Sequence, residues 1–246
     1  MLEIGEVSFA FTPGRWLFRD VSLTVAPGSV VAVLGPNGRG KTTLLRCAAG
    51  LLTPSGGTVE AGGAVGYVPQ AHSSAFAYRV IDMVLMGRAR HLKAYASPKA
   101  RDHALAAAAL ERVGLSHLAD RPFTAISGGE RQLVLIARAV ASGSTVLVLD
   151  EPAAALDLRN QGQVLNLLRD LAAEGMAILM TTHHPDHALY LADRVVLMMG
   201  PDDVRIGPAD ALLTDQMLSQ LYQVRVRTIS YDDEGTPRRV LATSFT

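Results

Sequence analysis

The sequence is poor in cysteine, in excess charge and in long apolar runs, and each shortage excludes a class of protein. Cys47 is the only cysteine, so the chain can form no internal disulfide and has no cysteine-rich metal framework. Basic and acidic residues number 23 each, and the formal charge of +0 predicts no affinity for nucleic acid. Apolar runs such as 30–34 and 104–110 are far shorter than the roughly 20 residues of a membrane-spanning helix.

The N-terminal segment lacks the pattern of a secretory signal, since residues 1–11 contain no basic stretch followed by a long apolar core. This excludes a secretory signal, and we expect the chain to remain in a reducing cytosol. The 49% share of hydrophobic residues in 246 predicts a compact fold with a substantial core. Within that core, Cys47 is expected to be an ordinary buried helix residue.

Hydrophobic periodicity predicts an α/β protein. Alternating apolar positions in residues 1–30, around a turn at Pro13 and Gly14, predict antiparallel strands. Continuously apolar segments predict buried parallel strands, and segments with helical spacing predict helices between them. The expected strands are 29–34, 65–68, 145–149, 177–181 and 195–199, and the expected helices are 41–49, 159–174 and 185–192.

A mainly helical block interrupts this pattern between residues 71 and 141. Helices are predicted for 80–86, from an N-cap at Ser97 and Pro98 to Val113, and from Ser127 onward. We expect one domain over 1–246, with a catalytic α/β core of 1–70 and 142–246 and a helical subdomain of 71–141. After Gly200 we expect a helical piece at 210–222, a strand at 224–229 and a surface turn at 231–239.

A glycine-rich loop lies between an expected strand and an expected helix and matches G-x-x-x-x-G-K-[ST]. Its backbone N–H groups can surround phosphate oxygens, Lys41 can reach the β and γ oxygens, and the Thr42 hydroxyl can ligate Mg²⁺. An ordinary glycine-rich turn is the alternative. The residues predicted to bind ATP here are Gly35, Pro36, Asn37, Gly38, Arg39, Gly40, Lys41, Thr42 and Thr43.

Two adjacent carboxylates, Asp150 and Glu151, follow the apolar strand at 146–149. Asp150 would hold Mg²⁺, and Glu151 would orient and deprotonate the attacking water. An acidic pair after a strand is commonly a solvated loop or a helix cap, but its combination with a phosphate-binding loop favours catalysis.

The segment from Ile126 to Gln132, with the sequence ISGGERQ, resembles the signature of ATP-binding-cassette (ABC) ATPases. The resemblance covers essentially the whole chain. It implies a P-loop NTPase cassette with a RecA-like, mixed or parallel sheet core, an antiparallel N-terminal β-subdomain and a helical subdomain. The residues that carry the resemblance occur in the family's order: the phosphate-binding loop, Gln70, the signature, Asp150, Glu151, Asp157 and His183.

The resemblance also assigns roles to single residues. Phe11 matches the aromatic residue that stacks on adenine, with core packing as the alternative. Gln70 matches the glutamine that senses Mg²⁺ and the attacking water, with a surface glutamine as the alternative. Asp157 matches a loop that touches the opposite subunit, with a helix N-cap as the alternative. His183 matches the switch histidine that bonds the γ-phosphate, and Lys41 and Glu151 complete the catalytic set.

Some residues depart from the family pattern or allow another interpretation. Glu130 stands where the family has glutamine, and we expect its side chain to face away from the anion site. Ala153 and Ala154 replace a more usual polar pair, which affects hydrogen bonding across the dimer. His183 lies near two further histidines, a grouping that could hold a metal, but the chain has no H-E-x-x-H pattern and no nearby thiol.

A single loop and a single signature imply a homodimer in which each ATP lies between two chains. The residues expected to act in trans are Ser127, Gly128, Gly129, Glu130 and Asp157. The resemblance implies ATP and Mg²⁺ as ligands and an integral membrane permease, in two copies, docking near the stretch from Phe76 to Arg90. A periplasmic or surface binding protein is implied as an indirect partner. The implied location is the cytoplasmic face of the inner membrane, as a peripheral subunit.

Three further segments, at 80–88, 115–127 and 213–222, are less specific but resemble the ATPases of bacterial metal-chelate importers. The expected cargo is an iron-siderophore, haem, cobalamin, or a molybdate or tungstate oxyanion. Two alternatives remain: the ATPase of an exporter, and a soluble cassette ATPase with no role in transport.

Overall fold

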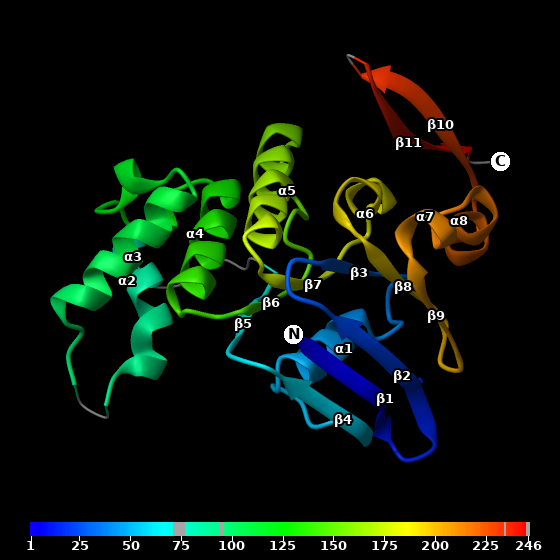
Figure 1. The fold of residues 1–246 in the computed structure, drawn as a ribbon, viewed down its shortest axis with the longest axis horizontal. Helices are drawn as coiled ribbons and strands as arrows, with labels where there is room; N and C mark the ends of the chain where they lie inside the picture. The colour runs from blue at the N-terminus through cyan, green and yellow to red at the C-terminus, as the bar shows by residue number, and fades with distance from the viewer. Residues whose placement is uncertain (71–76, 94–95, 234, 245–246) are drawn as a thin grey trace.

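The core of the fold is a six-stranded sheet, as the computed structural model of the chain shows for residues 1–70, 77–93, 96–233 and 235–244 (Figure 1). Four neighbouring pairs are parallel, and only the edge pair, β8 with β9, is antiparallel. Three of the inner strands, at 30–34, 146–149 and 177–181, are buried along their whole length, which explains their continuously apolar sequences. In spatial order the strands are β5 (Val65–Val68), β6 (Val146–Leu149), β7 (Ala177–Thr181), β3 (Val30–Leu34), β8 (Arg194–Gly200) and β9 (Asp203–Pro208).

An antiparallel sheet of β2 (Arg15–Val25), β1 (Leu2–Thr12) and β4 (Gly56–Ala61) lies on one side of this core. Helix α1 (Lys41–Ala48) lies between the two sheets, and its buried Leu44, Leu45 and Cys47 join the apolar cluster that both sheets share. The antiparallel region and the burial of Cys47 were predicted. Strand β4 was not predicted, because none of its residues is fully buried and its sequence has no apolar alternation.

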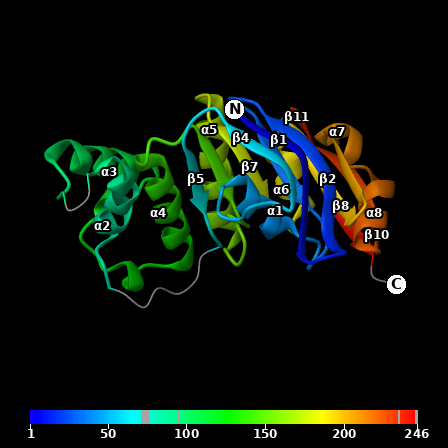
Figure 2. The ribbon, with the colours of Figure 1, turned by 90° about the horizontal axis from the view of Figure 1, so that it is seen from below.

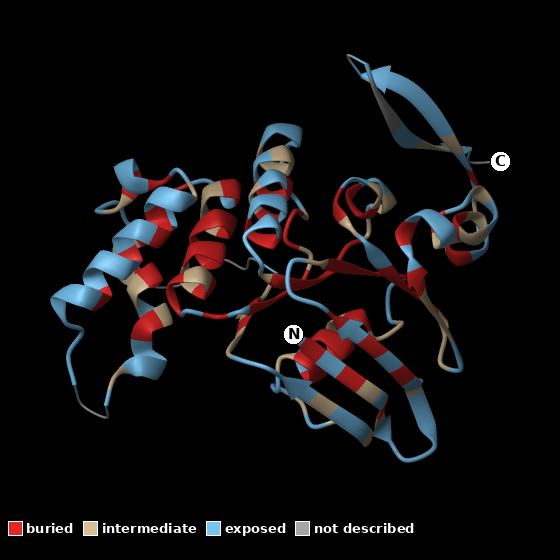
Figure 3. Ribbon diagram, viewed as in Figure 1, coloured by how far each residue is buried: buried red, intermediate tan, exposed pale blue. Residues whose placement is uncertain are grey.

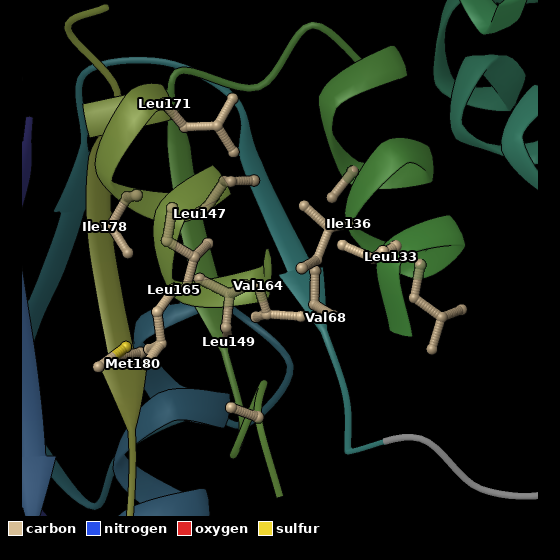
Figure 4. Close-up of a cluster of buried hydrophobic side chains, with 14 of the residues drawn as sticks. Val68, Leu133, Ile136, Leu147, Leu149, Val164, Leu165, Leu171, Ile178 and Met180 are labelled. Carbon is tan, nitrogen blue, oxygen red and sulfur yellow. The ribbon is translucent and has the colours of Figure 1, made fainter. Parts of the chain in front are cut away.

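The opposite face of the main sheet carries α5 (Leu158–Ala173) and α6 (Pro185–Leu191). Figure 4 shows side chains from three strands meeting those of two helices there. Leu147, Leu149 and Ile178 come from the strands, Ile136 comes from α4 (Gly128–Ala141), and Leu171 comes from α5. Burial is concentrated in the sheet and in the helix faces that touch it (Figure 3).

A group of helices stands at one end of the molecule (Figures 1 and 2). The group comprises α2 (Val80–Leu85), η1 (Met86–His91), α3 (Ala100–Arg112), η2 (Ser116–Leu118), η3 (Phe123–Ala125) and α4. The predicted N-cap at Ser97 and Pro98 was wrong, because α3 begins at Ala100. The carboxylate of Asp102 accepts a hydrogen bond from the backbone N–H of Lys99 at 3.0 Å, and this contact fixes the first turn.

The C-terminal part forms α7 (Ala209–Leu212), α8 (Asp215–Tyr222) and a hairpin of β10 (Arg225–Asp233) and β11 (Thr236–Ser244). The predicted surface turn at 231–239 was therefore wrong, since most of it is strand. The hairpin projects from the body and is mostly exposed, so burial imposes no apolar alternation on its sequence (Figure 3). Among the described residues, every helix falls short of the length and apolar character that crossing a bilayer requires.

A close backbone contact between Gly87 and Arg138 leads to a prediction about stability. A Cβ on Gly87 would overlap the carbonyl oxygen of Arg138, so Gly87→Ala must separate η1 from α4. We expect it to lower the free energy of unfolding by about 1–3 kcal/mol, the usual cost of overpacking. The measurement is the midpoint of urea unfolding.

The matched control is Gly162→Ala within α5. Nothing lies within 4 Å of the position of its Cβ, so this variant should gain about 0.5–1 kcal/mol from the better helix propensity of alanine. Equal midpoints for the two variants would contradict the inferred contact.

Candidate active site

The phosphate-binding loop joins the carboxyl end of β3 to the first turn of α1. Gly40 is the N-cap of α1 and has a φ of 92°, in the left-handed region. A Cβ there would lie 2.8 Å from Leu17 Cγ and 2.9 Å from Phe18 Cδ1, so both backbone conformation and space require glycine. The loop is therefore fixed against β2, with the N-terminus of α1 directed at its concave side.

Lys41 lies inside this loop and is buried. Its Nζ donates to the carbonyl oxygens of Gly35, at 2.7 Å, and Pro36, at 3.0 Å. Burial lowers the pKa of Lys41, while the nearby carboxylates of Glu151 and Asp150 act in the opposite direction. The ammonium group is thus held between the loop backbone and the acidic pair after β6.

Asp150 connects three strand ends. Its Oδ1 accepts hydrogen bonds from the hydroxyls of Thr42, at 3.1 Å, and Thr181, at 2.7 Å. The Thr181 hydroxyl oxygen in turn accepts from the backbone N–H of Glu151 at 2.8 Å. The carboxyl ends of β6 and β7 and the first turn of α1, which follows β3, are therefore joined by one buried carboxylate and one buried hydroxyl.

Glu151 has a φ of 50°, an uncommon backbone conformation for a residue other than glycine. Its Oε1 lies 2.5 Å from Nε2 of His183, and its Oε2 accepts a hydrogen bond from Nε2 of Gln70 at 3.4 Å. Glu151 thus contacts both of the other residues that were singled out separately in the sequence, and it is held between them.

A cavity of about 280 Å³ opens beside these groups. Phe11, at its edge, is 75% exposed and touches Phe9 edge-on with ring centroids 4.9 Å apart. The alternative of core packing for Phe11 is therefore wrong. The residues that line the cavity are Phe11, Leu17, Asn37, Gly38, Gly40, Lys41, Thr42, Thr43, Glu151 and His183.

The signature residues do not line this cavity but form the first turn of α4. Ser127 is the N-cap, with its Oγ accepting from the Glu130 N–H at 3.3 Å, and the Glu130 carboxylate accepts from the Ser127 N–H at 2.7 Å. This capping box lowers the pKa of Glu130. The carboxylate of Glu130 thus turns back onto the Ser127 N–H, and the expectation that it faces away from the anion site stays a prediction.

The first turn of α4 packs on the first turn of α5. A Cβ on Gly129 would lie 2.6 Å from Cγ of Asn160, so only glycine allows this approach. Asn160 donates from its backbone N–H to Asp157 Oδ1 at 2.8 Å and from Nδ2 to Oδ2 at 3.0 Å. Asp157 is therefore the N-cap of α5, as one of the two interpretations of the sequence predicted. Ala153, near this turn, is buried.

The three neighbouring histidines have different environments. His183 faces Glu151, whereas the rings of His184 and His187 lie 4.8 Å apart. His187 is buried, and its two ring nitrogens lie 3.4 Å from the hydroxyl of Thr182 and from Oε1 of Gln161. Burial, followed by the charge of His184, lowers the pKa of His187 to about 4, so it is neutral near pH 7.

The oxygen-bearing side chains around Asp150 fit Mg²⁺, which prefers hydroxyl and carboxylate oxygens and keeps several water ligands. Thr42 and Asp150 are already adjacent, and Gln70 lies across the site next to Glu151. In the ranges that the structure describes, no cluster of three or more histidine, cysteine, aspartate or glutamate residues could hold a metal by itself. A magnesium ion here would therefore depend on phosphate and water for its remaining ligands.

The sequence analysis missed Thr181, Leu17 and Asn160. Thr181 bridges Asp150 to Glu151, Leu17 lines the cavity, and Asn160 joins the signature turn to Asp157. Only Thr181 had a usable signal, a hydroxyl at the carboxyl end of a buried strand two residues before His183. The other two become neighbours of the site through tertiary packing alone.

Comparison with known sequences supports this description. The sequence profile of the family described as "ABC transporter" matches residues 18–154, more than half of the chain. The molybdate import ATP-binding protein MolC of Haemophilus influenzae is 42% identical over 91% of this chain and 88% of its own. A hemin import ATP-binding protein, HmuV of Nocardia farcinica, is 38% identical over 91% of this chain and 81% of its own. A cobalamin import ATP-binding protein, BtuD of Halobacterium salinarum, is 36% identical over 87% of this chain and 56% of its own.

A solved structure of an ABC transporter shares the fold of this chain. A chain from a metal-chelate type ABC transporter in an inward-facing conformation aligns with a TM-score of 0.94 and 38% identity, over 99% of this chain and 97% of that one. The chain therefore belongs to the ABC transporter family, as an ATP-binding subunit in the group that includes relatives named for molybdate, hemin and cobalamin import.

Proposed function

We propose that this chain is the ATP-hydrolysing subunit of an importer that takes up a metal chelate or a metal oxyanion through a separate permease. One observation carries the catalytic part: the carboxylate of Glu151 lies between His183 and Gln70 at the cavity that contains Lys41. The names of the relatives support the cargo class, since they specify molybdate, iron chelatin, hemin and cobalamin.

The residues of the cavity divide the chemistry between them. Backbone N–H groups of residues 35–43 and the ammonium of Lys41 would hold the phosphates, with adenine against the exposed ring of Phe11. Glu151 would accept a proton from the attacking water. His183 would donate to the γ-phosphate, and Gln70 would hold the water in line.

Thr42, Asp150 and Gln70 are the proposed residues for Mg²⁺. When bound, this ion would neutralise negative charge that develops on the phosphate oxygens. Thr181 fixes the positions of Asp150 and Glu151, because its hydroxyl donates to the carboxylate of Asp150 and accepts from the backbone N–H of Glu151. A small movement of β7 would therefore displace both carboxylates together.

The complete site requires two chains. The signature turn from Ser127 to Glu130 and the loop at Asp157 lie outside the cavity of their own chain. We propose that they cover the nucleotide of a second copy in a homodimer. Because Gly129 packs on Asn160 and Asn160 bonds Asp157, these two trans-acting segments form one rigid unit.

The helical part, over 71–141, is the proposed docking site for the permease, and 1–70 with 142–246 is the proposed catalytic core. The stretch from Phe76 to Arg90 was singled out from the sequence, and Phe76 itself lies outside the described residues. Within the rest, Met86 is 43% exposed at the junction of α2 and η1. An apolar side chain exposed there suits contact with a helix of a membrane protein. The chain would then act as a peripheral subunit at the cytoplasmic face of the membrane, with a binding protein as an indirect partner.

The first prediction concerns the general base. Glu151→Gln keeps the shape of the side chain but cannot accept the proton, so ATP turnover should fall by roughly 10²–10⁴-fold with ATP binding retained. Steady-state phosphate release and equilibrium nucleotide binding measure the two effects. Glu60→Gln is the matched control, because it makes the same change at an exposed carboxylate on β4, and it should keep wild-type turnover. Wild-type turnover in Glu151→Gln would exclude Glu151 as the base.

The second prediction concerns the homodimer. Glu151→Gln saturated with Mg-ATP should elute as a dimer in size-exclusion chromatography with light scattering, and as a monomer without nucleotide, because ATP joins the two chains.

Adding Gly128→Glu to that variant should abolish the dimer. Gly128 is exposed, and no atom lies within 4 Å of the position of its Cβ. A carboxylate in the first helical turn is favourable in the free chain, whereas in the dimer it would face the γ-phosphate. Dimers of equal stability with and without this change would contradict the proposed interface.

The third prediction concerns the permease. Met86→Glu places a charge on the proposed contact and should strongly reduce co-purification with the permease of the transporter. Leu51→Glu, at a position that is 56% exposed outside the helical part, should not reduce it. Equal recovery of permease with both variants would show that docking occurs elsewhere.

A further inference from the structure

A second and larger cavity lies away from the nucleotide site. It has a volume of about 780 Å³, against about 280 Å³ at the phosphate-binding loop. Its walls come from η1, α3, the end of α4 and the residues Leu92, Lys93, Ala96, Ser97 and Lys99 between η1 and α3. Figures 1 and 2 place these helices at one end of the molecule, away from α1. The volume is in the range of sites for small organic ligands.

The lining of this cavity is strongly basic. It contains five lysine and arginine side chains and one histidine, but only one carboxylate, that of Asp102. The chain as a whole has equal numbers of basic and acidic residues, so this concentration is local. Asp102 is already bonded to Arg88 Nε at 3.1 Å and to the Lys99 N–H. The basic side chains are Arg88, His91, Lys93, Lys99, Arg101 and Arg112.

Arg88, the buried member of this group, has unused hydrogen-bond donors. Arg88 is 8% exposed, and besides Asp102 it donates from Nη1 to the carbonyl of Ala141 at 2.8 Å. No described residue accepts a hydrogen bond from its Nη2, although a guanidinium carries five N–H groups. The ring of His91 is fixed beside it, 2.7 Å from the carbonyl of Ser142. The cavity therefore has a positioned guanidinium in its wall and exposed cations at its rim, of which Arg112 is already paired with Glu174.

The remaining wall is apolar and includes Leu92, Leu105, Ala109 and Val140. A fitting ligand thus combines several negative charges with an apolar portion. A phosphate ester does so, since it carries nearly two charges and three acceptor oxygens that match arginine in bidentate geometry.

We propose that this cavity binds a small organic phosphate, with the phosphate oxygens held by the basic side chains and the apolar part against Leu105 and Val140. The ligand would cross-link η1, α3 and α4 and would stabilise the helical part of the chain. Both a soluble phosphate ester and the headgroup of an anionic phospholipid offer this chemistry. The inference does not depend on the proposed transport function.

The test uses 1-naphthyl phosphate as the probe and isothermal titration calorimetry as the measurement. The nucleotide site is first saturated with a non-hydrolysable Mg-ATP analogue, so that binding there does not contribute. Wild-type protein should bind the probe with an affinity that falls with added salt.

The double variant Lys93→Ala with Arg101→Ala should bind the probe roughly tenfold or more weakly, because two charge-assisted contacts are lost. Both residues are exposed, so the variant should fold. Arg225→Ala, an exposed arginine on β10, is the matched control and should bind as wild type. The absence of binding up to millimolar probe, or equal affinity in the double variant, would overturn the proposal.

Vesicle sedimentation distinguishes the two sources of phosphate. Phosphatidylcholine vesicles with phosphatidic acid, whose headgroup is a phosphate monoester, should retain the wild type and lose the double variant if the ligand is a lipid headgroup. If the ligand is soluble, 1-naphthyl phosphate binds but the vesicles retain both proteins equally. Equal retention together with no binding of the probe rejects the cavity as a phosphate site.

Discussion

The active site depends on one buried carboxylate that joins the ends of two parallel strands to the helix that follows a third. Asp150 accepts from Thr42 after β3 and from Thr181 at the end of β7, and it lies at the end of β6. The parallel sheet places these ends at one edge, and the hydrogen bonds fix their distances. The position of Glu151, and through it of His183, follows from this arrangement. The two hydroxyl donors stabilise the buried carboxylate there, because both donate to its Oδ1.

A second constraint acts on the surface that would face another chain. Gly129 and Asn160 bring the first turns of α4 and α5 into contact, and Ser127 and Asp157 cap those two turns. Each side chain used for capping is one that the family resemblance assigns to the partner's nucleotide. Capping keeps these oxygens oriented and leaves the helix N-termini as sites for negative charge. The stability of the single chain and the geometry of the dimer are therefore linked through the same residues.

The distribution of charge supports two separate anion sites within a chain of zero formal charge. At the phosphate-binding loop, one buried ammonium is balanced by two carboxylates, which suits a ligand that arrives with its own cation. In the cavity between η1, α3 and α4, basic residues outnumber the acidic ones, and the single carboxylate is engaged by Arg88. The first site is suited to Mg-ATP, and the second to an anion without a metal.

The sequence by itself determined the alternation of strands and helices, the phosphate-binding loop and the identity of most site residues, because these are local patterns of spacing and residue type. It predicted the first part of β10 but did not determine β4, the end of β10 or β11, whose residues are too exposed to show a pattern. Only the tertiary structure decided that Thr181 joins Asp150 to Glu151, that Glu130 turns back onto Ser127, and that six basic residues between Arg88 and Arg112 share one cavity. Such contacts depend on distances between elements, which residue spacing along a chain does not encode.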